Sequence, residues 1–292
     1  MPTPPTSQDD EHYRALSVAF LTYIAKAFGL IKDIKPTGDI GQWLPFALTA
    51  HVVQLGRAIH SLVELGYADE GIPIGRQMMS ATMNQLFIVS SGNPSGWGLR
   101  YWLQIGDLEH RLFERELRKA RFDESKLTQM HSQANANREA DIRDFEATGN
   151  VLPEKLVDPG RRQPRRDTWT GLSDKALADR LGLFDWYDGE YNYLSTVTHA
   201  QAVSVLPIAQ GLRDGHLPAA GPHFRSPLAA IGVAVTALHY SVMATLKHYG
   251  LVALSNQADR AKTQMEGAID RYRNATGITQ FVSDAFGSPR PR

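Results

Sequence analysis

The sequence predicts an all-α fold, a multi-helix bundle with a protruding polar helical hairpin. Apolar residues recur at intervals of three and four along every long segment, which is the spacing of one helix face. No alternating strand pattern persists, and clusters rich in Gly and Pro separate the periodic segments. We expect helices over residues 13–31, 43–65, 74–89, 97–121, 125–147, 173–181, 184–206, 227–254 and 257–285.

The ends of the first helices are marked by residues that cap or break a helix. The segment 13–31 follows two aspartates, either of which can serve as its N-terminal cap. Gly66 ends the second segment, and the cluster 91–96 (SGNPSG) separates the third from the fourth.

The fourth and fifth segments change character along the chain. Residues 97–121 begin with large apolar side chains and end in the charged string RLFERELRKAR, and residues 125–147 are polar throughout. We expect these two helices to form an antiparallel hairpin. The loop 149–171 follows with three prolines and the basic run 161–166, and Ser173 is placed to cap the next helix.

Length and composition are those of an ordinary globular chain. Its 292 residues are 42% hydrophobic and 21% charged. We expect a single helical domain over residues 1–292, with a core of about 10–121 and 170–285 and an inserted hairpin and basic loop of about 105–168.

Charge and cysteine content exclude some classes of function. The formal net charge is zero, from 31 basic and 31 acidic residues, which argues against nucleic-acid binding through a global positive field. The absence of cysteine excludes disulfides, thiolate nucleophiles and cysteine-bound metal centres. The first residues do not have the pattern of a secretory signal, so we expect a cytoplasmic protein.

Residues 227–246 are long enough and apolar enough to span a membrane. They also include Thr236, His239, Ser241 and Thr245, and many of their apolar residues are alanines. A helix at the centre of a bundle gives the same pattern. We expect the buried helix and no membrane association.

The segment 169–200 holds the main candidate site. Asp188, Tyr191, Ser195 and His199 follow at three- and four-residue spacing and would share one face of an α-helix. Such polar groups are costly to bury unless they bind each other, a ligand or water. The stripe therefore indicates either a site or a buried hydrogen-bonded pair of Ser195 and His199.

Arginines on the second and third helices are the expected ligand-binding groups. Arg76 lies on an otherwise apolar helix face, where it needs an anion. Asp188 or Glu64 could supply that anion internally, and a ligand phosphate is the alternative. We assign Arg76, Asp188 and Arg57 to ligand binding.

Two further polar stripes and the basic run are weaker indications of a metal or phosphate site. The stripes carry ligand types that helical bundles use for metals, but the paired Glu-x-x-His signature is absent, so we expect no metal and no other cofactor. These stripes are Arg57, His60 and Glu64, and Asp107, His110 and Glu114. The basic run 161–166 either contacts phosphates or RNA or is simply solvated.

An ordered series of motifs resembles an uncharacterised bacterial group, domain of unknown function family 5677. The series consists of LVELGY at 62–67, DE at 69–70, IGR at 74–76, WTG at 169–171, and the Tyr-x3-Ser-x3-His of Tyr191, Ser195 and His199. The resemblance covers roughly residues 45 to 205 and implies a helical fold. Members typically carry a glutamate where this chain has Ser80.

More distantly, the motif helix is similar to that of HEPN domains, which are helical bundles that include many metal-independent ribonucleases of defence and toxin systems. Their late helix often reads Tyr-x2-Arg-Ser-x3-His, and this chain has Leu194 at the arginine position. The resemblance implies His199 as the catalytic proton-transfer residue, oriented by Ser195 and Tyr191. The cation would then come from Arg76, Arg57 or the basic run.

Two functions therefore stay open. One is a helical ligand-binding or interaction protein with a polar interior site around His199. The other is a HEPN-like ribonuclease or nucleotide-acting effector, so whether the protein is an enzyme is undecided. The expected partners are a small anionic ligand or RNA, with a homodimer as a further option.

Overall fold

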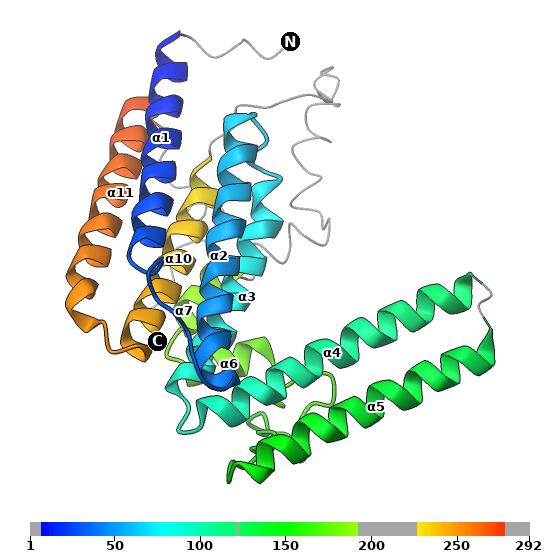
Figure 1. Ribbon diagram of the computed structural model, residues 1–292. Coiled ribbons are helices and arrows are strands. Elements are labelled where there is room, and N and C mark those ends of the chain that lie inside the picture. The colour runs from blue at the N-terminus through cyan, green and yellow to red at the C-terminus, as the bar shows by residue number, and fades with distance from the viewer. Residues whose placement is uncertain (1–6, 121–122, 192–226, 278–292) are drawn as a thin grey trace. The chain divides into compact units, whose positions relative to one another are not determined.

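The computed structural model describes residues 7–120, 123–191 and 227–277, and every regular element in these ranges is helical (Figure 1). The predicted all-α, multi-helix fold is confirmed for this part of the chain. The elements are α1 (Ser7–Gly29), α2 (Ile40–Glu64), α3 (Gly71–Ser90), α4 (Pro94–Lys119), α5 (Glu124–Ala147), α6 (Asp174–Arg180), α7 (Phe184–Trp186), the π-helix η1 (Tyr187–Tyr191), α10 (Leu228–His248), the 3-10 helix η2 (Val252–Leu254) and α11 (Ser255–Thr276).

The described chain divides into two compact units. The first, called here the bundle unit, contains the described parts of Met1–Lys35, Phe46–Leu86 and Leu181–Arg292. The second, called the hairpin unit, contains the described parts of Pro36–Pro45 and Phe87–Arg180. The single domain with an inserted hairpin stays a prediction.

In the bundle unit, α1 packs against both α10 and α11. Tyr23 on α1 donates a hydrogen bond from its hydroxyl to the Val235 carbonyl on α10, at 3.1 Å. On α3, Gly75 lies so close to α10 that a Cβ atom there would stand 3.2 Å from the Val233 side chain. This glycine therefore allows the two helices to approach closely.

The apolar segment expected at the centre of a bundle forms α10. Among the described residues, α10 is a helix long and apolar enough to cross a membrane, and 67% of its apolar window is buried within the protein. That degree of burial is typical of a core helix. The helix is thus buried, as the sequence predicts.

Four fully buried polar residues form a hydrogen-bonded network on α10 and its neighbours. The Nε2 atom of Gln85 donates to the hydroxyls of Thr49 at 2.7 Å and Thr245 at 2.8 Å. Ser241 donates to the Oε1 atom of the same glutamine. Because all four side chains have partners, the network avoids the cost of buried unpaired polar groups.

In the hairpin unit, α4 and α5 lie side by side and antiparallel (Figure 1). Leu99 and Leu103 of α4 form a small core with Phe145 of α5. Most of α5 is exposed, which agrees with its polar sequence. The predicted pairing of these two helices is confirmed.

The beginning of α4 corrects a predicted boundary. The sequence predicts a helix breaker at 91–96 and a helix that starts at residue 97. Instead, the helix begins at Pro94, and the Asn93 side chain accepts a hydrogen bond from the Gly96 N–H at 2.8 Å. Proline suits the first helical position because its missing N–H would have no helical partner there.

The expected α-helix over 184–206 is wrong in its first part. The α-helical segment is only α7, and it is followed by the π-helix η1. A π-helix bonds residue i to i+5, so the 3.6-residue spacing that places Asp188 and Tyr191 on one stripe does not apply there. Residues from 192 onward in this segment lie outside the described residues.

Candidate functional site

The residues that join α5 to α6, 148–173, form the least regular part of the hairpin unit and are called here the connecting segment. The segment folds back on itself through two backbone hydrogen bonds. The Leu156 N–H donates to the Thr170 carbonyl at 2.7 Å, and the Arg165 N–H donates to the Gly171 carbonyl at 2.9 Å. These bonds fix the path of a segment that has no helical hydrogen bonds of its own.

Trp169 anchors the connecting segment in an aromatic cluster. Its ring meets those of Phe87, Trp97 and Tyr101 edge to face, with centroids 5.4, 5.9 and 5.2 Å away. Edge-to-face aromatic pairs at these distances are stabilising beyond the area that they bury. The WTG motif thus begins with a residue that holds the segment to the helices of its unit.

Gly171 completes the motif with a conformation that favours glycine. Its φ is +84°, and a Cβ atom there would lie 2.1 Å from the Leu156 carbonyl oxygen. No side chain can be placed at that distance without moving the backbone. The motif is therefore structural in this chain, and it sets the position of the residues on either side.

Asp158 pairs with two arginines of the basic run 161–166. This buried carboxylate accepts hydrogen bonds from the Ser173 N–H at 2.8 Å and from the Nε of Arg165 at 3.1 Å, and it lies 3.5 Å from the Nε of Arg161. Burial raises the pKa of Asp158, but these hydrogen bonds outweigh it and hold the pKa below its usual value. Two arginines of the run are therefore paired internally.

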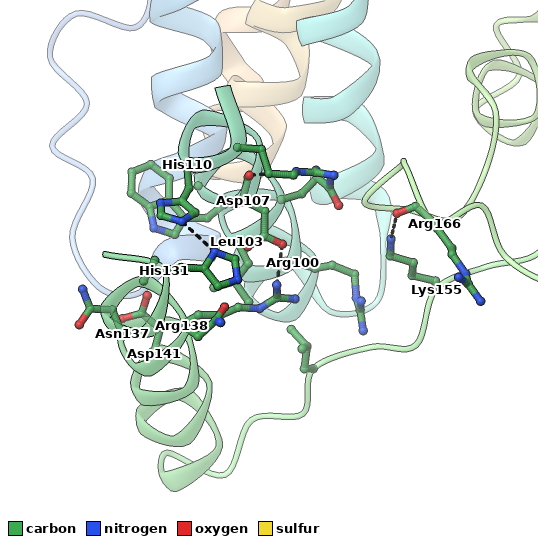
Figure 2. Close-up of a pocket in the computed structure, with 17 residues that line it drawn as sticks. Arg100, Leu103, Asp107, His110, His131, Asn137, Arg138, Asp141, Lys155 and Arg166 are labelled. Atoms are coloured by element: carbon green, nitrogen blue, oxygen red, sulfur yellow. Dashed lines mark hydrogen bonds and ion pairs between the residues drawn. The ribbon is translucent and has the colours of Figure 1, made fainter. Parts of the chain in front are cut away.

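Arg166, from the same run, lines a cavity of about 530 Å³ between α4, α5 and the connecting segment (Figure 2). Of the charged side chains that line the cavity, more are positive than negative, and two histidines line it as well. The charged and histidine residues are Arg100, Arg111, Arg138, Lys155, Arg166, Asp107, Asp141, His110 and His131.

In the part of the chain that the structure describes, four of the five cations that line the cavity, Arg100, Arg111, Lys155 and Arg166, form no ion pair with a carboxylate. The Nε of Arg100 donates to the Pro153 carbonyl at 2.7 Å, and the Nζ of Lys155 donates to the Arg166 carbonyl at 3.1 Å. Within the described residues, no carboxylate oxygen lies within 4.0 Å of the charged nitrogens of Arg100, Lys155 or Arg166. None of the three is therefore in a direct ion pair, although the charge of Glu154 raises the pKa of Arg100 and the charges of Asp167 and Asp107 raise that of Lys155.

The mutual repulsion of the cations affects their proton affinity. Burial lowers the pKa of Lys155, and Arg100 and Arg138 lower it further. Burial and Arg138 likewise lower the pKa of Arg100. An anion placed among these groups would offset the repulsion between the cations.

A second part of the lining is internally paired. Arg138 on α5 forms an ion pair with Asp107 on α4, with 2.5 Å between Nη1 and Oδ2. Figure 2 shows this pair, and beside it His110 and His131 facing each other from the two helices. This part of the cavity holds α4 and α5 together.

The residues predicted for a site around His199 are only partly described. Ser195 and His199 lie outside the described residues, and of Tyr191 only the backbone is described, at the end of η1. Asp188 is exposed, and Arg76 is half-buried on α3. Their grouping around a common interior site stays a prediction, as does the ribonuclease hypothesis that rests on it.

Two residues of the predicted polar stripe on α2, Arg57 and His60, contact side chains of α1. The guanidinium carbon of Arg57 lies 5.5 Å from the centre of the Phe28 ring. His60 is buried, with its Nε2 atom 3.2 Å from the Ser17 hydroxyl and its Nδ1 atom 3.6 Å from the Glu64 carboxylate. Neither arginine assigned to ligand binding lines the cavity of the hairpin unit.

Nothing in the sequence marks Arg100 or Lys155 as a functional residue. Each is an isolated cation in its own segment, and only the fold of the connecting segment brings them together with Arg166. The basic run is the one signal in the sequence near this cavity, since it contains Arg166.

Comparison with known proteins gives one match. The model of a family of unknown function (DUF5677) matches residues 42–209, which is more than half of the chain and includes every residue that lines the cavity. No curated protein and no solved structure matches the chain.

Proposed function

The chain belongs to the family of unknown function DUF5677, and we propose that it is a helical ligand-binding protein for a small anion. The site is the cavity of the hairpin unit, and the ligand carries phosphate or carboxylate oxygens. The observation that carries this proposal is that Arg100, Lys155 and Arg166 line one cavity and that none of them forms an ion pair with a carboxylate of the described residues.

The chemistry of the three cations suits oxyanions. An arginine presents several N–H donors in one plane, and a lysine ammonium presents a compact charge, so together they can bind several oxygens of one group. Burial and the repulsion from Arg100 and Arg138 lower the pKa of Lys155, and burial and the repulsion from Arg138 lower the pKa of Arg100. A bound anion removes that repulsion, which makes binding more favourable than at an isolated surface arginine.

The size of the cavity favours a small molecule over RNA. Pockets for small ligands have volumes of about 300–1,000 Å³, and this cavity has about 530 Å³. The chain also has no net positive charge to attract a nucleic-acid backbone from a distance. We therefore propose the small anionic ligand as the partner and leave RNA as a control in the test.

The test is a calorimetric titration of the full chain with inorganic phosphate and with pyrophosphate. Arg166→Ala removes one cation while keeping the backbone carbonyl that Lys155 uses. We expect about a tenfold loss of affinity, because a hydrogen bond to a charged group contributes about 1.5 kcal/mol. Arg162→Ala is the matched control, since it removes an exposed arginine of the same run that does not line the cavity.

Equal affinity of wild type, Arg166→Ala and Arg162→Ala would place anion binding elsewhere on the chain. Tight binding of single-stranded RNA that competes with pyrophosphate, together with no binding of the small anions alone, would also contradict the proposal. Both results are measurable in the same titration format.

A further inference from the structure

We propose that His110, Glu114 and His131 form a binding site for a divalent transition-metal ion of the Zn²⁺ type. The inference departs from the sequence-based expectation that the protein holds no metal. It concerns different side chains from those of the anion proposal, and it stands on their geometry alone.

The three side chains come from two helices that face each other. His110 and Glu114 lie one turn apart on α4, and His131 lies on α5. One ligand atom from each residue can be chosen so that all three lie within 4.8 Å of one another. Side chains from both arms of a helical hairpin thus point to one place.

The distances are close to those of a metal site. The Nε2 atom of His110 lies 3.1 Å from the Nδ1 atom of His131. Two nitrogens bound to zinc at about 2.1 Å with a tetrahedral angle are about 3.4 Å apart. The Oε2 atom of Glu114 is 3.9 Å from the same Nδ1 atom of His131. A small rotation of the glutamate side chain closes that distance.

The glutamate is already oriented for this role. Its Oε1 atom accepts two hydrogen bonds from Arg118, from Nη2 at 2.8 Å and from Nε at 3.1 Å. The other oxygen, Oε2, is the one that lies 3.9 Å from the Nδ1 atom of His131. Ligating carboxylates are commonly held in place in this way by an outer hydrogen-bond partner.

The ligand types select the class of metal. Two imidazoles and one carboxylate suit zinc and its neighbours in the first transition series, whereas calcium and magnesium prefer a shell made only of oxygens. Three protein ligands leave a fourth position for water, as in open zinc sites. His110 and His131 also line the cavity, so that position is accessible from solvent.

The test uses the full chain after removal of metal with a chelator, titrated with Zn²⁺ and, separately, with Co²⁺ followed by visible absorption. We expect a zinc site whose affinity falls at least tenfold in His131→Ala and in Glu114→Gln, and cobalt bands that both variants lose. His51→Ala is the control, because it removes an exposed histidine on α2 and leaves this site intact.

The variants are also compared by circular dichroism without metal, so that a loss of folding is distinguished from a loss of ligands. Zinc affinity and cobalt bands that are the same in wild type, His131→Ala and Glu114→Gln would overturn the proposal. A loss of zinc affinity in His51→Ala that equals the loss in His131→Ala would overturn it as well.

Discussion

The ammonium group of Lys155 donates hydrogen bonds to the backbone carbonyls of Arg166, at 3.1 Å, and Thr168, at 2.5 Å. One cation of the cavity is therefore held by the backbone of the residue that supplies another. Because carbonyls and not carboxylates satisfy the lysine, its position is fixed while its charge stays available to a ligand. The connecting segment thus builds the site and also contributes to it.

Gly171→Ala should displace the connecting segment. The new Cβ atom would lie 2.1 Å from the Leu156 carbonyl oxygen, so the backbone must move and the cavity should lose its affinity for phosphate. Gly160→Ala is the matched control, because Gly160 also has a positive φ, +79°, but has no atoms within 4 Å of the added methyl group.

Both substitutions place alanine in the left-handed region, which costs about 1–2 kcal/mol. We expect Gly171→Ala to lower the free energy of unfolding by about 2 kcal/mol more than Gly160→Ala does, as measured by urea denaturation. Of the two variants, only Gly171→Ala should weaken phosphate binding. Equal effects of the two variants would show that the close contact does not determine the path of the segment.

Asp158→Asn should destabilise the protein by about 1–3 kcal/mol near neutral pH, because its half-buried partners Arg165 and Ser173 would lose charge-assisted hydrogen bonds. The pKa of Asp158 is held below 3.8 in the folded protein, so its contribution is present above that pH and is lost as pH falls through the folded-state pKa. The difference in urea denaturation between wild type and variant should therefore shrink only in acid. Asp179→Asn, an exposed aspartate on α6, should show little effect at any pH.

Anion affinity should fall as pH rises toward 10.5, the ordinary pKa of lysine. Burial and the neighbouring Arg100 lower the pKa of Lys155, so this cation loses its proton at a lower pH than an exposed lysine does. Sulfate is the probe, because its own charge does not change in that range. In Lys155→Arg the group stays charged, so the same titration series should lose most of its pH dependence. An unchanged pH profile in that variant would assign the effect to another group.

Gln85→Leu should lower the free energy of unfolding by about 1–3 kcal/mol. It removes the side chain that joins the buried hydroxyls of Thr49, Ser241 and Thr245, and leaves them with fewer partners. Gln77→Leu, at an exposed position of the same helix, is the control and should change stability by less than about 0.5 kcal/mol. Equal denaturation curves for the two variants would mean that the network contributes nothing measurable.

The helices could be predicted from the sequence because their apolar faces repeat at a period that the chain itself displays. The start of α4 at Pro94 could not be predicted, since Asn93 and Pro94 can start a helix as well as interrupt one. The π-helix η1 could not be predicted either. No period in the sequence marks the change to i to i+5 bonding, and the hydrogen bond that the Trp186 indole N–H donates to the Glu190 carboxylate there is equally invisible in the spacing.

The candidate sites were harder to predict because they depend on contacts between distant segments. The spacing of His110 and Glu114 predicts a polar stripe on one helix, but it does not predict the pairing of α4 with α5 that brings His131 to them. The same holds for Arg100 and Lys155, which meet only because the connecting segment folds back through Thr170. Periodicity describes one helix at a time and says nothing of such pairings.

The most direct test of the anion site is a crystal structure of the wild-type chain grown with tungstate, a phosphate-like anion whose heavy atom can be located by anomalous scattering. We predict tungstate in the cavity of the hairpin unit, with oxygens within hydrogen-bond distance of Arg100, Lys155 and Arg166. Tungstate bound at full occupancy at another place, with none in this cavity, would contradict the proposed function.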